Sequence, residues 1–480
     1  YYYYYCLPPL RSEVGGALIP IASPKFSHSN FFFFFLIFSF SLFLLPFTII
    51  NSLPPVHTQL LLLITLNQSI HTSHHVKVGS RKVCIETPCP ARSNHPNSIP
   101  LSVSAITGSA EPIYGPEAFH SITDTIKPGQ NPFGALTRQD LEWRAPWSSH
   151  VETQTFYFTS PTGHYGFAQI IHSNPVGLHF TAQFTCRVVH DTKPEDCVWT
   201  STNLEDFEAK GTEFNAHKVS ISLSEDATTY KISSHVNENS IVDFTVKRLS
   251  EGFKIGETGN SLYGEDPAAP WGSMRHVFWP RNSLNGTIKI GEGRTIEIKD
   301  GQAMYVMAMQ GMKPHHAAAR WNFVNFQAPT TSVVVMEFTT PASYGSCTVS
   351  VGGVTRDNAL LFTSIDVKVT HLDAEVDEVG WPAPKRITFD LTGPAPHPDK
   401  DANTYTAHLS GDLSKLVERV DVMAEIPNFV KKVVAGVSGA KPYIYQFSDR
   451  NMAVKISNKE TGEVLVEEKG HGFCETTFIS

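Results

Sequence analysis

The chain has 480 residues, 18% of them charged, and a formal net charge of −8 at pH 7. Residues 1–100 hold 6 of the 38 basic and 2 of the 46 acidic residues, which leaves 32 basic and 44 acidic residues, a net charge of −12, for residues 101–480. This acidic body has no run of Lys or Arg, which argues against nucleic-acid binding, because that function needs clustered basic side chains against phosphate. Its four cysteines are scattered, so we expect no disulfide framework and a reducing compartment.

Residues 1–103 differ from the rest of the chain in composition. They include the run FFFFFLIFSFSLFLLPFTII at 31–50, which is long enough to cross a bilayer as a helix. The segment is nearly free of acidic residues and shows no periodic pattern, and no methionine precedes Met274. We interpret 1–103 as a low-complexity leader translated from non-coding or intronic sequence, in preference to a transmembrane or signal segment, and we assign 104–150 to an N-terminal arm.

Alternation of apolar and polar residues dominates the chain from residue 151 onward. In LHFTAQFTCRV at 178–188, every second side chain from Leu178 is apolar, which predicts a strand with one buried face. The pattern recurs, with a break at 313–330, at 217–224, 229–236, 241–249, 287–301, 304–310, 331–340, 347–353, 364–372, 386–393, 404–411, 442–449 and 452–469. Turn signals separate these runs at the spacing expected of antiparallel barrels or sandwiches.

The strand-rich part divides into two blocks of similar length, which we assign as residues 151–318 and 319–480. Each block suits an eight-stranded up-and-down barrel, which is wide enough inside for one small ligand. We therefore predict an all-β protein with two tandem antiparallel β-barrels and few short helices. One helix is predicted in IPNFVKKVVAGVSG at 426–439, starting at Pro427 and ending at Gly436. It would pack against a barrel wall or, alternatively, form a lid or touch a membrane.

The stretch MYVMAMQGMKPHHAAARWNFVNF at 304–326 is the most unusual in composition. It holds four of the eight methionines, and alternation places Tyr305, Met307 and Met309 on one strand face and Met304 on the other. Methionine is unbranched and polarizable, so these side chains suit the wall of a lipid pocket as well as an ordinary core. The nearby Trp271, Met274 and Trp279 favour the pocket.

We expect no metal site and no cofactor. His315 and His316 are adjacent, so their side chains diverge on a strand and lie about 100° apart on a helix, and no acidic residue stands at a zinc-site offset. We interpret them as structural histidines at the joint between the two blocks. Arg275, His276, Arg281 and Arg320 are candidates for buried polar roles, and a buried arginine needs a lipid headgroup or a carboxylate as its partner.

Catalytic motifs are weak. The chain has no GxSxG elbow, P-loop or dinucleotide-binding GxGxxG. An enzyme alternative is a hydratase or cyclase acting on an apolar, isoprenoid-type substrate, in which His276 works with Glu265 or Asp266 facing the cavity.

Four long strings resemble the fungal survival factor family: SAITGSAEPIYGPEAFHSIT at 104–123, WGSMRHVFWPRNSLNGTI at 271–288, QGMKPHHAAARWNFVNFQ at 310–327 and VKKVVAGVSGAKPYIYQF at 430–447. The resemblance covers residues 104–480. It implies two tandem lipocalin-like domains and a cytoplasmic protein, possible also in the nucleus, that is peripheral on endoplasmic reticulum and Golgi membranes. Family members begin with a short membrane-binding helix, where this chain has NSIPLSVSAITG, a poor helix former with Pro100 inside it.

The resemblance implies a non-enzymatic carrier of ceramide that moves sphingolipid between endoplasmic reticulum and Golgi and supports survival under oxidative stress. We select the conspicuous apolar side chains of 271–326 and one histidine as candidate lipid-binding residues: Trp271, Met274, His276, Trp279, Met307, Met309, Met312, Trp321 and Phe323. The carrier hypothesis requires that at least one barrel is hollow enough for an acyl chain.

Overall fold

The computed structural model of the protein describes residues 114–480 except 175–179, 292, 313 and 422–440. The leader, the poor helix former at 97–108 and the helix predicted at 426–439 therefore lie outside the described residues, as does the side chain of His315. The described residues form antiparallel sheets, and their helical elements have only three or four residues each. The predicted fold class is confirmed. Within the described ranges, no helix is long and apolar enough to span a membrane.

Fifteen strands make up the larger sheet, which curls around its own core and is called the first barrel. Along its hydrogen-bonded path the order is β6-β5-β4-β3-β15-β14-β11-β10-β9-β8-β7. The strands are β1 (Phe119–His120), β2 (Phe133–Ala135), β3 (His150–Thr159), β4 (His164–Asn174), β5 (Thr181–His190), β6 (Val198–Asn203), β7 (Glu208–Lys210), β8 (Glu213–Ala216), β9 (Val219–Leu223), β10 (Thr229–Ser234), β11 (Ile241–Arg248), β12 (Phe253–Ile255), β13 (Asn260–Tyr263), β14 (Gly272–Ile290) and β15 (Arg294–Gln310).

Ten strands make up the second barrel, with the order β19-β18-β17-β16-β27-β26-β24-β23-β20 and β25 paired with β26. They are β16 (Arg320–Gln327), β17 (Thr331–Thr339), β18 (Thr348–Arg356), β19 (Ala359–Ser364), β20 (Asp366–Leu372), β23 (Arg386–Pro394), β24 (Thr404–Asp412), β25 (Leu416–Asp421), β26 (Tyr443–Asn458) and β27 (Val464–Phe478). A separate two-stranded sheet pairs β21 (Glu375–Val376) with β22 (Pro382–Ala383).

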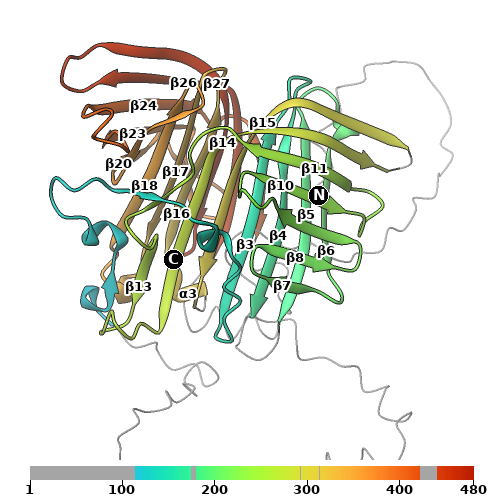
Figure 1. Ribbon diagram of the computed structural model, residues 1–480, viewed down its shortest axis with the longest axis horizontal. Helices are drawn as coiled ribbons and strands as arrows, with labels where there is room; N and C mark the ends of the chain where they lie inside the picture. Colours follow the sequence, from blue (N-terminus) through green and yellow to red (C-terminus); the bar gives the residue numbers. More distant parts are fainter. Residues whose placement is uncertain (1–113, 175–179, 292, 313, 422–440) are drawn as a thin grey trace, which may run out of the picture.

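The two barrels repeat one topology. In each, four consecutive strands, β3–β6 or β16–β19, run outward in sequence order, and a long C-terminal hairpin returns to pair with the first of these four. The hairpins are β14–β15, with strands of 19 and 17 residues, and β26–β27, with strands of 16 and 15 residues. Figure 1 shows the barrels side by side with β14 and β15 between them. The short helix α3 (Pro314–Ala317) connects β15 to β16.

Strand β14 contains Pro280, which has no backbone N–H to donate to a ladder. The pairing of β14 with β15 shifts register between Trp279 and Asn282, so the proline sits in an irregularity where prolines are tolerated in sheets. Arg281 lies within the same irregularity, and its guanidinium contacts residues of the second barrel. The strand itself continues past this point, which the sequence pattern did not predict.

Segment 114–143 ties the two barrels together. The backbone N–H groups of Tyr114 and Gly115 donate to Ser343 O of the second barrel at 2.9 and 2.8 Å, while β1 pairs with β13 and β2 with β12 in the first barrel. At its C-terminal end Asp140 Oδ1 receives hydrogen bonds from Lys254 Nζ at 2.8 Å and Arg275 Nη2 at 2.9 Å. Arg275 therefore has its expected carboxylate partner, supplied by this segment.

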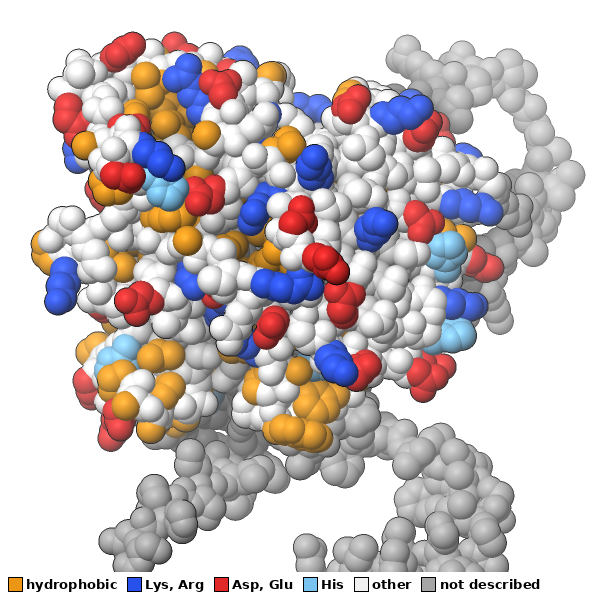
Figure 2. Space-filling view, in the orientation of Figure 1, with side chains coloured by type: hydrophobic (Ala, Val, Ile, Leu, Met, Phe, Trp, Pro, Cys, Tyr) orange, Lys and Arg blue, Asp and Glu red, His pale blue; other side chains and the backbone are white. Residues whose placement is uncertain are grey.

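The remaining helical elements are one-turn 3-10 helices. Three of them, η2 (Pro116–Ala118), η3 (Ile122–Thr125) and η4 (Arg138–Leu141), belong to the N-terminal segment, and η5 (Pro194–Asp196) and η6 (Ala342–Tyr344) lie in loops. On the face shown in Figure 2, acidic and basic side chains are interspersed, and no large basic patch is visible on that face.

Arg281 links the two barrels through hydrogen bonds of its guanidinium group, which we call the Arg281 clasp. Its guanidinium donates to the carbonyl oxygens of Ala328 at 3.0 Å and Pro329 at 2.6 Å, to Ser332 Oγ at 3.0 Å and to Asn358 Oδ1 at 2.9 Å. All four acceptors belong to the second barrel, whereas Arg281 lies on β14 of the first. By contrast, Arg320 is exposed and lies over the ring of Phe478 at 5.9 Å.

Replacing Arg281 should loosen this clasp. We expect Arg281→Met to lower the free energy of unfolding by about 2–4 kcal/mol, because several buried carbonyl groups lose a charged donor. Urea unfolding of the full chain measures the change. Arg294→Met is the control, since Arg294 is half-exposed and its nearest acid, Asp196, is 3.6 Å away. Equal effects of the two substitutions would contradict the clasp.

Candidate functional site

Residues 274–282 of β14 and 303–308 of β15 are buried on both strand faces. Tyr305 and Met307 point into the core of the first barrel, whereas Met304 and Val306 belong to a second core that lies between the barrels. The predicted alternation along 304–309 is thus confirmed. We call the core between the barrels the interbarrel layer; its larger members are Phe119, Tyr157, Phe253, Met274, Phe278, Met304, Met312, Trp321, Phe323, Val334, Met336, Phe338 and Phe473.

The nine residues selected from the sequence divide between these cores. Two of them, Trp279 and Met307, lie inside the first barrel. Met309 is half-buried at the end of β15. Met309 also lines cavity 2, so the interbarrel layer, with the residues that pack against it or line its cavities, brings together seven of the nine: Trp271, Met274, His276, Met309, Met312, Trp321 and Phe323.

Large side chains fill the interior of the first barrel. Trp279 packs against Tyr230 and Tyr305, with ring centroids 5.0 and 5.2 Å away, and Phe156 lies 5.2 Å from Tyr230. The hydroxyl groups of Tyr230 and Tyr305 are hydrogen-bonded at 3.1 Å. These aromatic residues come from four different strands, so they meet across the barrel and occupy the place where the sequence analysis expected a ligand.

The second barrel has a similarly packed interior, with Phe326, Phe362, Phe389 and Phe447 all buried in one cluster. The carrier hypothesis required at least one hollow barrel. In the described part of the chain, aromatic side chains fill both barrel interiors at these clusters. Apolar free space occurs instead between the barrels.

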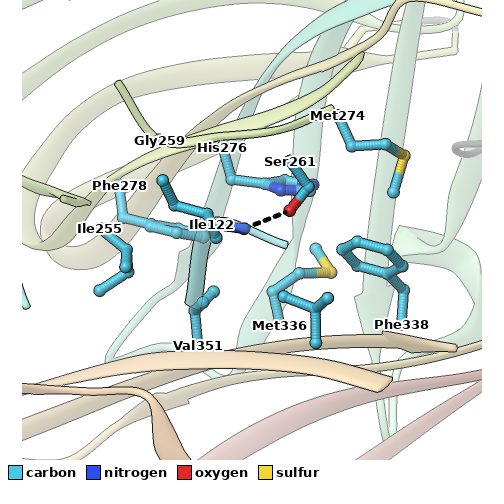
Figure 3. A pocket seen from close by; sticks show the side chains of 11 residues that line it. Ile122, Ile255, Gly259, Ser261, Met274, His276, Phe278, Met336, Phe338 and Val351 are labelled. Carbon is cyan, nitrogen blue, oxygen red and sulfur yellow. Dashed lines mark hydrogen bonds between the residues drawn. The ribbon is translucent and has the colours of Figure 1, made fainter. Parts of the chain in front are cut away.

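Cavity 1 lies between the two barrels, where Met274 and His276 face Met336, Phe338 and Val351 (Figure 3). The free space is about 10 Å³, roughly the room that one water molecule needs. Its full lining is Ile122, Ile255, Gly259, Ser261, Met274, His276, Phe278, Met336, Phe338, Val349 and Val351.

The N-terminal segment covers cavity 1. Ile122 lines it, and the backbone N–H of Ile122 donates to Ser261 Oγ at 3.0 Å. Beside it, Phe119 packs edge to face on Tyr263 of the first barrel at 4.9 Å and on Phe338 of the second at 6.1 Å. One segment thus closes the cavity by contacting both of its walls.

Cavity 2 adjoins cavity 1, because Met274 and His276 line both. It is also about 10 Å³ and is lined by Val151, Thr153, Met274, His276, Ala308, Met309, Gln310 and Trp321. Within the described residues, Thr153 Oγ1 and Gln310 Oε1 are buried without a hydrogen-bond partner. Unsatisfied polar atoms at a cavity are places where a ligand or a water molecule can bind.

His276 does not meet the acid that the enzyme alternative requires. Glu265 and Asp266 are both exposed, whereas His276 is buried, with its ring near Phe278 and Trp321. Burial, reinforced by the charge of Arg275, lowers the pKa of His276 to about 3, so its imidazole is neutral at pH 7. Neither of the two named carboxylates therefore forms an acid–base pair with this histidine.

A buried carboxyl group also lies beside the interbarrel layer. Glu475 on β27 shares a strand face with Phe473, which belongs to the layer, and Glu475 Oε1 accepts a hydrogen bond from Gln446 Nε2 at 2.7 Å. Burial raises the pKa of Glu475 from 4.5 to about 7. The group is therefore mostly protonated below pH 7 and can donate as well as accept a hydrogen bond there.

The sequence analysis missed the partners that complete the site. Met336, Phe338, Val349 and Val351 come from β17 and β18, whose alternation was predicted but whose packing partner was not, and Ile122 comes from the N-terminal segment. It also missed a buried cluster inside the first barrel: His150, Glu152 and His172. Their signal was His-x-Glu on β3, which places both side chains on one strand face.

Comparison with known proteins decides the family. Residues 97–480 match the Svf1 family. This chain belongs to that family. The resemblance to the fungal survival factor family is thereby confirmed.

Two fungal relatives and one solved structure illustrate the comparison. The ceramide-binding protein SVF1 of Candida albicans is 51% identical over 382 residues, which cover 79% of this chain and 98% of that protein. The ceramide-binding protein svf-1 of Neurospora crassa is 46% identical over 382 residues, again covering 79% and 98%. The crystal structure of CghA with Sch210972 aligns with a TM-score of 0.47 at 10% identity, over 76% of this chain and 98% of that one, and is too distant to support an argument.

The raised pKa of Glu475 makes stability fall as the pH rises. Between about pH 4.5 and 7 the folded state keeps a proton that the unfolded state has lost, so the free energy of unfolding decreases over that range. We expect Glu475→Gln, which keeps an acceptor for Gln446, to remove this part of the dependence. The variant should gain up to about 3 kcal/mol relative to the parent between pH 5 and pH 8.

Urea unfolding at both pH values measures this gain. Glu467→Gln, an exposed position on the same strand, is the control and should change stability by less than about 0.5 kcal/mol. A stability difference between parent and Glu475→Gln that stays constant from pH 5 to pH 8 would show that the buried carboxyl is not shifted.

Proposed function

We propose that this protein binds ceramide in the interbarrel layer, without catalysing a reaction on it. The observation that carries the proposal is the convergence of four of the eight methionines, Met274, Met304, Met312 and Met336, on one apolar layer that borders cavities 1 and 2. Met274 lies on β14, Met304 on β15, Met312 just after β15 and Met336 on β17. The names of the relatives in Candida albicans and Neurospora crassa support the choice of ceramide.

An apolar layer lowers the cost of removing a lipid from a membrane. Moving an acyl chain of ~16 carbons into water costs more than about 10 kcal/mol, at about 0.8 kcal/mol per methylene. Side chains that surround the chain replace the lost hydrocarbon contacts, and methionine adapts its shape to a flexible ligand at little cost. This function needs no nucleophile or acid–base pair.

Ceramide is far larger than the present free space, so the layer must open to admit it. We propose that the N-terminal segment moves aside, because its Phe119 and Ile122 side chains insert between the barrels. Hydrogen bonds hold this segment to both barrels. Displacement of these two side chains would join cavity 1 to the surface while leaving both barrel cores intact.

The polar groups around the cavities suit the headgroup of a ceramide. Its amide and hydroxyl groups both donate and accept hydrogen bonds. Thr153 Oγ1 and Gln310 Oε1 offer buried acceptors in cavity 2, the neutral His276 lines both cavities, and Ser261 lines cavity 1. A few such groups in an apolar site are enough to orient a lipid.

We further propose that the protein is cytoplasmic and peripheral on endoplasmic reticulum and Golgi membranes, and that it transfers ceramide between them. The protein would then support survival under oxidative stress indirectly, through its effect on the balance of membrane lipids. The family resemblance motivates both proposals. Two of the described cysteines favour the indirect route, because burial raises the pKa of Cys186 to about 12 and also raises the pKa of Cys474, so neither is a reactive thiolate at neutral pH.

Methionine-to-glutamine substitutions distinguish the layer from the barrel interiors. Met336→Gln and Met274→Gln place a polar amide against the proposed acyl chain and should reduce ceramide uptake by roughly tenfold. Met307→Gln and Met452→Gln make the same change inside the first and second barrels and are the matched controls. Native mass spectrometry of the purified chain after incubation with ceramide-containing liposomes measures the uptake.

Stability measured in parallel separates loss of binding from loss of folding. If Met307→Gln or Met452→Gln abolishes uptake while both interbarrel variants retain it, the ligand lies inside a barrel and the proposed site is wrong. If the parent protein takes up no ceramide at all, the proposed function is wrong.

Transfer is tested separately from binding. We expect purified protein to speed the movement of fluorescent ceramide from donor to acceptor liposomes, in proportion to its concentration. Met336→Gln should lose this activity and Met452→Gln should keep it. If the protein binds ceramide but does not speed its transfer between liposomes, the binding function is retained and the proposed carrier function is rejected.

A further inference from the structure

One end of the first barrel holds a buried cluster that the ceramide proposal does not use. His150 and Glu152 on β3 lie on the same strand face as Phe156, which belongs to the core of the first barrel. His172 on β4 is the direct cross-strand partner of Glu152 and shares its face with Ile170, another member of that core. The three side chains therefore lie on the inner wall of the barrel, and all three residues are buried.

The geometry of the three residues suits a single metal ion. One ligand atom from each, a histidine nitrogen or a carboxylate oxygen, lies within 4.8 Å of the other two. His150 Nε2 and His172 Nδ1 are 3.4 Å apart, which is long for a hydrogen bond between two nitrogens. Two nitrogen ligands about 2.05 Å from a tetrahedral ion stand about 3.4 Å apart, so the observed separation matches that of two histidines on one ion.

Neighbouring groups hold the ligands in the required state. His150 Nδ1 lies 3.0 Å from Ser148 O, a carbonyl that can only accept, so Nδ1 carries the proton and Nε2 presents its lone pair toward His172. Glu152 accepts hydrogen bonds from the backbone N–H groups of Arg144 at 2.8 Å and Ala145 at 2.9 Å. Such outer bonds to histidine and carboxylate are usual around metal ligands.

A second observation points to something bound at this end of the barrel. Gln154, the next residue on the same face of β3, is fully buried, and neither its Oε1 nor its Nε2 has a hydrogen-bond partner among the described residues. A fully buried amide with both atoms unsatisfied is rare in native proteins and marks the place of a water molecule or an ion with its bound water. Three protein ligands leave a fourth position of a tetrahedral ion for such a water.

Aromatic side chains enclose the cluster. The ring of Phe180 stacks on His172 at 5.3 Å, and Trp143 meets the same histidine edge to face at 6.0 Å. Apolar surroundings exclude bulk water and strengthen the attraction between an ion and its ligands. Two nitrogens and one carboxylate suit zinc or a similar first-row divalent ion, whereas calcium and magnesium prefer oxygen ligands alone.

We propose that His150, Glu152 and His172 form a zinc-type divalent metal site inside the first barrel. The site faces the barrel interior, whereas the proposed ceramide site lies between the barrels. Metal binding and ceramide binding can therefore be tested independently.

Cobalt serves as the probe, because four-coordinate Co²⁺ absorbs strongly in the visible range and zinc does not. The full chain is stripped with EDTA and titrated with Co²⁺, and Zn²⁺ is then added to displace it. We expect one Co²⁺ per chain with a four-coordinate spectrum, and its loss on addition of Zn²⁺. Metal content after gel filtration gives the zinc stoichiometry.

Two variants test the ligands. His172→Phe keeps a ring against Phe180 and Trp143 but removes the nitrogen, and Glu152→Gln keeps an acceptor for Arg144 and Ala145 but removes the charge. Each should weaken binding by more than the about 10–100-fold that outer partners contribute. His371→Phe makes the same ring exchange in the second barrel and should bind as the parent does. If His172→Phe fails to fold, Glu152→Gln decides.

Two results would overturn the proposal. One is a parent protein that retains no zinc or cobalt after gel filtration. The other is bound metal whose stoichiometry and spectrum stay the same in Glu152→Gln and in folded His172→Phe, which would place the ion elsewhere in the chain.

Discussion

Burial of both faces of the paired segments 274–282 of β14 and 303–308 of β15 is the constraint on which the rest of the structure depends. Val277 and Trp279 point into the first barrel, while Met274 and Phe278 point toward the second. Because side chains alternate strictly along a strand, a slip of one residue would exchange the two sets and place the wrong groups in both cores. One hairpin therefore fixes the packing of a barrel and the wall of the cavities beside it.

The shared strand order of the two barrels explains why the cavities lie where they do. In each barrel the long hairpin closes against the first strand of its unit, and these closing strands, β3 with β15 and β16 with β27, carry residues of the interbarrel layer. Two similar units placed side by side leave an apolar seam between them. The N-terminal segment, through Phe119 and Ile122, covers part of that seam, and Arg281 holds another part of it closed.

The sequence predicted those strands that have one solvated face. In β9, β10 and β11 every second residue is polar, and alternation identified them. Strands β3 and β4 were not recognised because both of their faces are buried, so that polar residues such as Glu152 and Gln169 occur among apolar ones without a regular pattern. In β14, Pro280 interrupted the signal although the strand continues beyond it.

For the candidate site, the sequence identified one wall. Met274, His276 and Trp321 were selected because the block 271–326 is rich in methionine and aromatic residues, and they do lie together. Alternation shows which residues share a face but not what that face packs against. For this reason Met336 and Phe338 were missed, and the ligand was expected inside a barrel rather than between the two.

The alternation along β14 also bears on how such a protein can diverge. Neighbouring residues of this strand belong to different cores, one inside the first barrel and one between the barrels, so selection acts on them separately. In the proposed ceramide site, changes at positions such as Met274 or Phe278 would alter which lipid is preferred, while the adjoining positions keep the barrel folded. Homologous proteins that change a few residues at this two-residue spacing would bind a different lipid while keeping the same fold.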